Sequence, residues 1–199
     1  MPEKAATGGI QMGKQELIKN GPWTVVERAE KYANRFGLKV FEDKVIRPDG
    51  KEGVYGWVSL NPGVSVLPVD EKGNVYLGKD FQYAIGKISL EAISGGINPG
   101  ETHLEAAKRE LKEELGITSK EWIYLGQFNS STAVVNSNQF LYMAKGLTFG
   151  EQELEAGENI KLVKISLEEA VNKVMDGTIF DGQTTSLILK VNHYIEKHC

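Results

Sequence analysis

One segment of this 199-residue chain constrains its fold more than any other, the stretch from residue 94 to residue 117. It opens with the glycine-rich string SGGINPG and continues into THLEAAKRELKEEL, whose apolar residues recur every three or four positions, as on one helix face. Thr102 and Glu105 have the spacing of a capping box, and Gly116 is suited to end a helix. The segment therefore predicts a tight loop followed by a helix over residues 102–115.

Three carboxylates share one face of this predicted helix. Glu110, Glu113 and Glu114 lie at positions i, i+3 and i+4, where like charges repel one another. A hard divalent cation such as Mg²⁺ or Mn²⁺ would relieve that repulsion, and Gly95 and Gly96 would let a phosphate approach the backbone closely. Taken alone, such a helix face is typical of a solvated surface and such a loop of a simple turn. The functional prediction therefore depends on their combination.

The remaining pattern predicts an α+β fold. Strands dominate residues 38–90, with turns at Pro48-Asp49-Gly50 and at residues 70–74. After the helix, further strands are expected at residues 122–128, 140–147 and 160–165, and two final helices at residues 166–177 and 184–198. This order of strands, helix, strands and helices predicts an α/β/α sandwich on a mixed β-sheet, preceded by an N-terminal β-hairpin region.

We divide the chain into three parts on this basis. Residues 1–20 are predicted to be a flexible tail, residues 21–60 an N-terminal strand and hairpin region, and residues 61–199 the main domain. The N-terminal part exceeds what a minimal domain needs, and residues 53–60 form an apolar, aromatic strand. We therefore expect a homodimer formed through this region.

Composition and charge limit the classes of partner. With 23 Lys and Arg against 27 Asp and Glu, the net charge of −4 argues against a nucleic-acid-binding surface. If the ligand carries phosphate, its negative charge must then be balanced at the binding site itself, by a metal ion or by a few cationic side chains. The only cysteine is Cys199, so neither an intrachain disulfide nor a thiolate zinc cluster is expected. The start of the chain has no apolar signal-peptide core and residues 123–144 are polar though uncharged, so we expect a cytoplasmic protein without membrane contact.

The complete string of residues 95–117 matches a known motif. It satisfies G-x5-E-x7-R-E-U-x-E-E-x-G-U, in which U is aliphatic, at Gly95, Glu101, Arg109, Glu110, Leu111, Glu113, Glu114, Gly116 and Ile117. That pattern is the Nudix box, and the chain resembles a Nudix hydrolase. The resemblance implies hydrolysis of a nucleoside diphosphate linked to another moiety, with Mg²⁺ as the cofactor and Mn²⁺ as a substitute.

The resemblance also implies roles for individual residues. Glu110 and Glu114 would be the principal metal ligands, Glu113 a further ligand or a group that orients water, and the backbone carbonyl of Ser94 would complete the metal shell. Arg109 and Glu101 would form an ion pair that supports the site. A base that activates water would come from a late acidic loop, whose candidates are Glu151, Glu153, Glu155 and Glu158; Glu155 is the residue assigned here. His103 is expected to be exposed on the first helical turn.

The surroundings of the box are similar to one branch of the family, the ADP-ribose pyrophosphatases and nucleotide-sugar hydrolases. The strings DFQYAIGKISLEAISGG and MDGTIFDGQTTSLI carry this similarity. Lys79 and Gln82 stand where the branch usually has Arg, and Asn98 where its loop often has Glu, so ADP-ribose and GDP-mannose both remain open as substrates. The predicted substrate-binding residues are Glu91, Gly95, Gly96, Lys79, Gln82 and Tyr83.

The resulting functional prediction is metal-dependent hydrolysis of the diphosphate bond of a nucleoside diphosphate sugar, to a nucleoside monophosphate and a sugar phosphate. Two alternatives stay open. One is a Nudix-fold module that senses a nucleotide sugar without cleaving it, in which a degraded box would be expected. The other is a hydrolase that removes unwanted nucleoside triphosphates, although such proteins tend to be shorter. An mRNA-decapping activity is disfavoured because it needs a basic RNA-binding surface.

Overall fold

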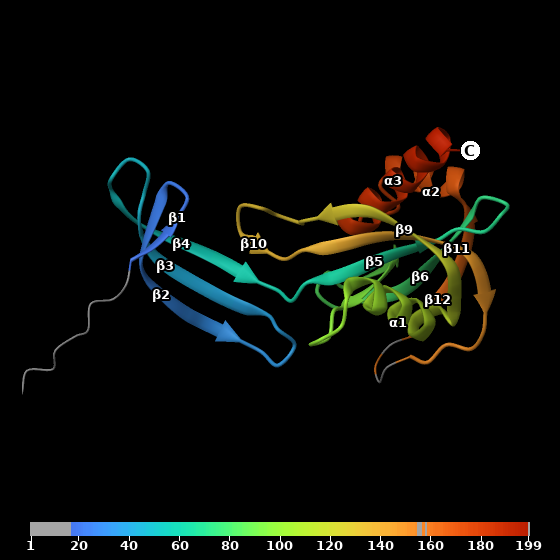
Figure 1. The fold of residues 1–199 in the computed structure, drawn as a ribbon, viewed down its shortest axis with the longest axis horizontal. Coiled ribbons are helices and arrows are strands. Elements are labelled where there is room, and N and C mark those ends of the chain that lie inside the picture. Colours follow the sequence, from blue (N-terminus) through green and yellow to red (C-terminus); the bar gives the residue numbers. More distant parts are fainter. Residues whose placement is uncertain (1–16, 155–156, 158, 199) are drawn as a thin grey trace, which may run out of the picture. The chain divides into compact units, whose positions relative to one another are not determined.

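The computed structural model describes residues 17–154, 157 and 159–198. Its contacts divide the chain after Ser59 into two compact units, which we describe separately (Figure 1). Of the tail predicted over residues 1–20, residues 1–16 lie outside the described part, whereas Ile18–Asn20 forms the first strand, β1. Within the described residues, no helix has the length and apolar character needed to cross a membrane.

The N-terminal unit contains an antiparallel sheet of four strands in chain order. Strand β1 is followed by β2 (Trp23–Ala33), β3 (Lys39–Ile46) and β4 (Glu52–Ser59). The turn between β3 and β4 is closed by a 2.8 Å hydrogen bond from Arg47 N to Lys51 O, and Gly50 adopts a φ of +79°. The turn that the Pro-Asp-Gly string predicts is therefore confirmed, because glycine tolerates this backbone conformation.

A buried carboxylate organises the side chains of this unit. Asp43 in β3 is only 4% exposed and accepts hydrogen bonds from Arg28 Nε at 2.8 Å, Arg28 Nη2 at 2.9 Å and Trp57 Nε1 at 3.1 Å. The guanidinium of Arg28 holds the pKa of Asp43 below its usual value. Phe41 stacks on Trp57 with the ring centroids 4.5 Å apart. The hydrogen-bonded Asp43 carboxylate and the stacked aromatic rings thus hold strands β2, β3 and β4 together.

The second unit is built on two sheets. Strands β5 and β11 run parallel at the centre of a four-stranded sheet of order β8-β5-β11-β9, whose other pairs are antiparallel, and an antiparallel sheet has the order β12-β6-β7. The strands are β5 (Gly63–Pro68), β6 (Asn74–Gln82), β7 (Lys87–Glu91), β8 (Ile93–Gly96), β9 (Ile117–Phe128), the two-residue β10 (Val135–Asn136), β11 (Gln139–Phe149) and β12 (Lys161–Ser166).

Helices cover these sheets on two sides (Figure 1). Helix α1 (His103–Leu115) packs Ala106, Ala107 and Leu111 against Val64, Val66 and Ile93, which forms one apolar core. Helices α2 (Leu167–Met175) and α3 (Gly182–His198) pack Ala170, Leu187 and Ile188 against Leu67, Leu77 and Met143, which forms a second core. The predicted α/β/α sandwich on a mixed sheet is confirmed.

Helix α1 begins and ends as its sequence predicts. The Thr102 side chain accepts from Glu105 N, and the Glu105 side chain accepts from Thr102 N, so the capping box is complete. At the other end, Gly116 has a left-handed φ of +66°, and its N–H reaches the carbonyls of Leu111 and Lys112. Both ends of the helix are therefore fixed by local hydrogen bonds.

Candidate active site

Arg109 joins the glycine-rich loop to the acidic face of α1. Its guanidinium donates to both carboxylate oxygens of Glu101, at 2.9 and 3.0 Å, and to the Gly96 carbonyl at 2.9 Å. It also contacts Glu110 at 2.7 Å and Glu113 at 3.1 Å. The ion pair predicted between Arg109 and Glu101 is present, and the structure adds that the same guanidinium contacts two further carboxylates, so that one positive charge is shared among three negative ones. The hydrogen bonds between Arg109 and Glu101 are the main cause that raises the pKa of Arg109 and lowers the pKa of Glu101.

Gly95 makes room for one of these carboxylates. A Cβ atom at residue 95 would overlap the carboxylate of Glu110, although the backbone of Gly95 lies outside the left-handed region. The glycine therefore leaves the space that the Glu110 carboxylate occupies, and it is not needed for an unusual φ. At Gly96 an added Cβ would meet no atom within 4 Å. The adjacent Ser94 is exposed in β8, opposite Ser65 in β5.

The three glutamates of the helix face differ in exposure. Glu114 is buried, with 8% of its surface exposed, whereas the side chains of Glu110 and Glu113 are 13% and 29% exposed. Three carboxylates on one helix turn supply the hard oxygen donors that suit a divalent cation such as Mg²⁺ or Mn²⁺. In the described part of the chain, however, no three acidic, His or Cys side chains already converge as a metal site. Binding an ion would therefore require Glu110 and Glu113 to rearrange around Arg109.

One acidic side chain of the late loop forms an ion pair with α1. Glu153 pairs with Lys112 of α1 at 2.8 Å. Glu155, which was assigned as the base, and Glu158 lie outside the described residues. The assignment of a base therefore stays a prediction.

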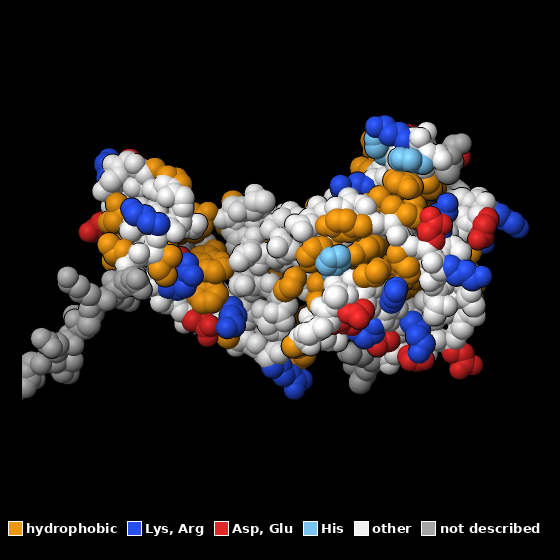
Figure 2. Space-filling model, in the orientation of Figure 1, with side chains coloured by type: hydrophobic (Ala, Val, Ile, Leu, Met, Phe, Trp, Pro, Cys, Tyr) orange, Lys and Arg blue, Asp and Glu red, His pale blue; other side chains and the backbone are white. Residues whose placement is uncertain are grey.

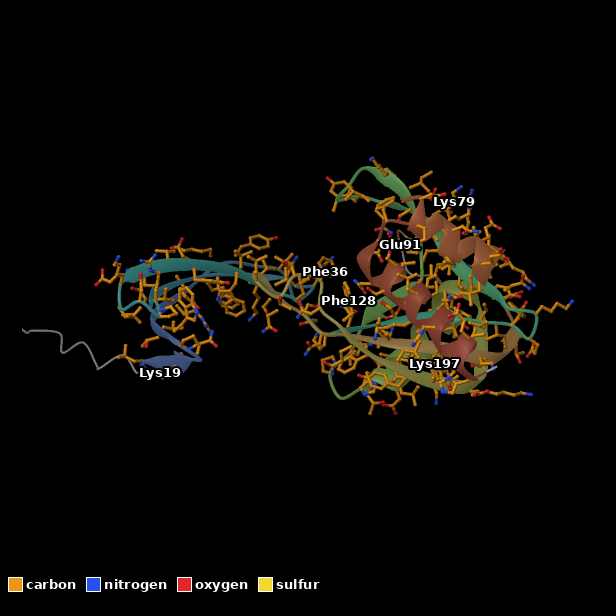
Figure 3. The ribbon with its side chains drawn as sticks, turned by 90° about the horizontal axis from the view of Figure 1, so that it is seen from above. Lys19, Phe36, Lys79, Glu91, Phe128 and Lys197 are labelled. Atoms are coloured by element: carbon orange, nitrogen blue, oxygen red, sulfur yellow. The ribbon has the colours of Figure 1, made fainter. Side chains whose placement is uncertain are left out.

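A second carboxylate site lies on the neighbouring strands β6 and β7, where Figure 3 labels Lys79 and Glu91. Gln82 Nε2 lies 3.3 Å from Glu91 Oε2. Burial raises the pKa of Glu91, and the charges of Asp181 and Asp80 raise it further. Asp181 also accepts hydrogen bonds from the backbone and hydroxyl of Thr184 at the start of α3. Glu91, a carboxyl group with a raised pKa beside further acidic residues, is therefore a candidate for ligand binding.

The predicted ligand residues Lys79 and Tyr83 are placed differently. Lys79 is exposed and lies opposite Lys161 of β12. Tyr83 lies at the tip of the β6–β7 hairpin and is 93% exposed. The structure thus brings Gln82 to Glu91, and Arg109 to Glu101, Glu110 and Glu113, while the substrate roles of Lys79 and Tyr83 stay predictions.

The start of α1 is anchored by an aromatic cluster that sequence analysis missed. His103 is half-buried, stacks on Phe140 with centroids 4.4 Å apart, and contacts the hydroxyl of Tyr142 through Nδ1. The expectation that His103 is simply exposed on the first turn is therefore wrong. Tyr124 stacks on the same imidazole at 5.7 Å, and Figure 2 shows hydrophobic side chains gathered on this face of the second unit.

Comparisons with known proteins place this site in a family. The model of the NUDIX domain matches residues 59–185. The chain is 26% identical over 153 residues to the ADP-ribose pyrophosphatase of Bacillus subtilis, which covers 76% of this chain and 83% of that protein. It is also 26% identical over 149 residues to the methanol dehydrogenase activator of Bacillus methanolicus, covering 74% and 80% of the two chains.

A solved structure has the same fold. The crystal structure of an ADP compounds hydrolase superposes with a TM-score of 0.77 at 21% identity, covering 92% of this chain and 97% of the other. Because the NUDIX domain model matches residues 59–185, the chain belongs to the Nudix family, as the box predicts, and the matched relatives support a hydrolase. The resemblance to the ADP-ribose pyrophosphatase branch is likewise confirmed as a similarity of sequence.

Proposed function

We propose that this chain hydrolyses the diphosphate bond of a nucleoside diphosphate sugar to a nucleoside monophosphate and a sugar phosphate. The observation that carries the proposal is the intact acidic face of α1, held to the glycine-rich loop by Arg109. ADP-ribose is the first substrate to test, because an ADP-ribose pyrophosphatase and an ADP compounds hydrolase are among the similar proteins. GDP-mannose is the second.

The cofactor of the proposed reaction is Mg²⁺, with Mn²⁺ as a substitute. Members of this family generally use divalent metal ions, and a bound ion would polarise the phosphoryl oxygens and lower the pKa of a water molecule. Glu110, Glu113 and Glu114 would hold the ion, together with the carbonyl of Ser94. Arg109 and Glu101 keep the loop and the helix at a fixed separation, so that the diphosphate and the carboxylates meet in one geometry.

The residues on β6 and β7 would bind the remainder of the substrate. The Glu91 carboxylate and the Gln82 amide lie together and offer acceptors and donors to sugar hydroxyl groups. Gly96 presents backbone with no atom within 4 Å of the place where a Cβ would lie, which would let a phosphate approach, and we assign the neighbouring Gly95, beside the carboxylate of Glu110, to the same loop. We assign Lys79 as a surface cation near this part of the site, and Tyr83 as a stacking residue for the base.

A panel of substrates tests the proposal. Purified protein is incubated with ADP-ribose, GDP-mannose, ADP-glucose and a set of nucleoside triphosphates in the presence of excess Mg²⁺, and the products are separated by chromatography. We expect a nucleoside monophosphate from at least one diphosphate sugar. Turnover of the triphosphates alone would support the triphosphate hydrolase instead. Tight binding of a sugar nucleotide without turnover would support a sensing module.

The proposed assembly is a homodimer formed through the N-terminal unit, in the same soluble compartment as its nucleotide substrate, the cytoplasm. Several large apolar side chains of that unit are exposed, including Phe36 at 74%, Val54 at 66% and Tyr32 at 55%. A second copy of the chain would cover such side chains and so remove them from water.

A further inference from the structure

The segment Gly150–Glu153, which follows β11, runs beside the end of α1 and binds its last carbonyl groups. Gly150 N donates to Gly116 O at 2.7 Å, and Glu153 N donates to Glu113 O at 2.9 Å. A helix leaves its last four carbonyls without partners from within the helix, so such contacts replace hydrogen bonds that water would otherwise supply. The carbonyls that this segment binds include those of the residues that carry the acidic face.

Gln152 binds a carbonyl group at the end of α1 through its side chain, whereas Gly150 and Glu153 bind such groups through the backbone. Its amide Nε2 donates to the carbonyl of Glu114 and, at 3.1 Å, to the carbonyl of Ile160, just before β12. Ile160 packs against the apolar core between α1 and the sheet, and its side chain lies close to Gly78 in β6. One amide group therefore connects the peptide of Glu114 to a backbone position that the core holds in place.

Gly116 permits this arrangement. A Cβ atom at residue 116 would lie 2.5 Å from Gly150 O and 2.7 Å from the carbonyl carbon of Glu151. The glycine therefore serves both as the left-handed end of α1 and as the gap into which the segment fits.

We infer that Gln152 is a positioning residue for metal binding, which holds the last turn of α1 so that Glu113 and Glu114 meet the ion in one geometry. Among the carbonyls that accept from this segment are those of Glu113 and Glu114, and fixing these carbonyls holds the backbone from which the two carboxylates extend. Hydrogen bonds around a metal ligand commonly set its orientation, and their loss typically lowers metal affinity about 10–100-fold. The inference rests on the proposed metal-dependent function but concerns a residue outside the box.

The test compares three substitutions at this position in the full chain. Gln152→Ala removes the two donors, and Gln152→Glu puts an acceptor opposite two carbonyls. Both are expected to weaken Mn²⁺ binding, followed by electron paramagnetic resonance without substrate, by about tenfold or more. Gln152→Lys keeps N–H donors and suits a helix C-terminus, so it is expected to restore affinity to near the wild-type value.

A matched control separates positioning from general stability. Lys112→Ala removes the exposed ion pair with Glu153 but leaves the carbonyl contacts intact, and its Mn²⁺ affinity is expected to stay unchanged. In a hydrolysis assay, the Ala and Glu variants should need more metal while their KM for substrate at saturating metal is unchanged.

Two results would overturn the inference. One is that the Ala and Glu variants melt at lower temperature but bind Mn²⁺ as the wild type does, which would leave Gln152 a purely structural role. The other is that wild-type protein binds no Mn²⁺. If wild type binds Mn²⁺ but hydrolyses no diphosphate sugar, the proposed function fails, while the comparison of affinities still decides the role of Gln152.

Discussion

At the scale of single residues, Arg109 does more than the sequence motif alone implies. Its guanidinium reaches two oxygens of Glu101, one carbonyl and two carboxylates of the helix face. A planar fork of five N–H donors can satisfy this set, whereas the single ammonium group of lysine cannot. The site therefore depends on the shape of the side chain as well as on its charge.

Replacing Arg109 tests this dependence. Arg109→Lys keeps the charge but loses most of these hydrogen bonds, so we expect kcat/KM for the diphosphate sugar to fall about 100-fold, which corresponds to about 2.7 kcal/mol of transition-state stabilisation. Lys108→Arg, on the exposed side of the same turn, is the control and should behave as wild type. Steady-state kinetics at saturating Mg²⁺ measure both. Equal activity of Arg109→Lys and wild type would contradict the assigned role.

The steric role of Gly95 gives a second prediction. Gly95→Ala places a Cβ atom on the carboxylate of Glu110, which must move away and give up its 2.7 Å contact with Arg109, at a cost of about 1 kcal/mol. The melting temperature should therefore fall by about 2–4 °C, which corresponds to this cost in a chain of this size. Gly96→Ala is the matched control, because a Cβ there meets no atom within 4 Å. Similar melting temperatures for the two variants would show that the space at Gly95 is not needed.

Glu91 makes stability depend on pH in a direction that its environment determines. Burial raises the pKa of Glu91, so the folded protein keeps this proton to higher pH than the unfolded chain, in which the pKa is about 4.3. The contribution of Glu91 to stability is therefore fully present below about pH 4, and it is lost as the pH rises through the raised pKa of the folded protein. Glu91→Gln should be more stable than wild type at pH 7 by thermal unfolding, and the difference should shrink below about pH 4. A variant that is less stable than wild type at pH 7 would contradict this account.

At the scale of secondary-structure elements, α1 is the element that its own sequence specifies most fully. Its periodicity, capping box and terminal glycine all lie within residues 102–116, and the structure has the helix at His103–Leu115. The turn at Gly50 was equally predictable because its residue types restrict φ locally. Local chemistry of this kind can be recognised from spacing alone.

Contacts between distant elements could not be predicted in the same way. Gln152 binds Glu114, which is 38 residues away, and His103 contacts Tyr142, which is 39 residues away. Neither glutamine nor histidine occurs in a pattern that would distinguish these partners from many others. The chain fold brings them together, so the anchors at the two ends of α1 emerge only from the structure.

The N-terminal cap of α1 gives a prediction at this scale. Thr102→Ala removes the acceptor for Glu105 N, which typically costs about 1 kcal/mol, whereas Thr102→Ser keeps an oxygen in place. Urea unfolding should show this loss in the free energy of unfolding for the Ala variant and a much smaller one for the Ser variant. If the Ala and Ser variants unfold at the same urea concentration, the cap contributes nothing measurable.

At the scale of the whole molecule, the N-terminal unit exposes large apolar side chains, which the proposed homodimer would bury. We predict that light scattering coupled to size-exclusion chromatography will give a mass of about twice the 22.0 kDa of one chain. Val54→Glu, at an exposed position of β4, should shift that mass toward one chain. A mass of one chain at every concentration examined would exclude the dimer.

The proposed reaction can be measured as release of AMP from ADP-ribose by the full chain, with and without Mg²⁺, beside the Glu113→Gln variant. We predict AMP and ribose 5-phosphate from the wild type only when Mg²⁺ is present, and a rate at least about 100-fold lower from Glu113→Gln, whose overall fold should persist. Equal rates for the two proteins, or release of AMP that does not depend on the metal, would contradict the account.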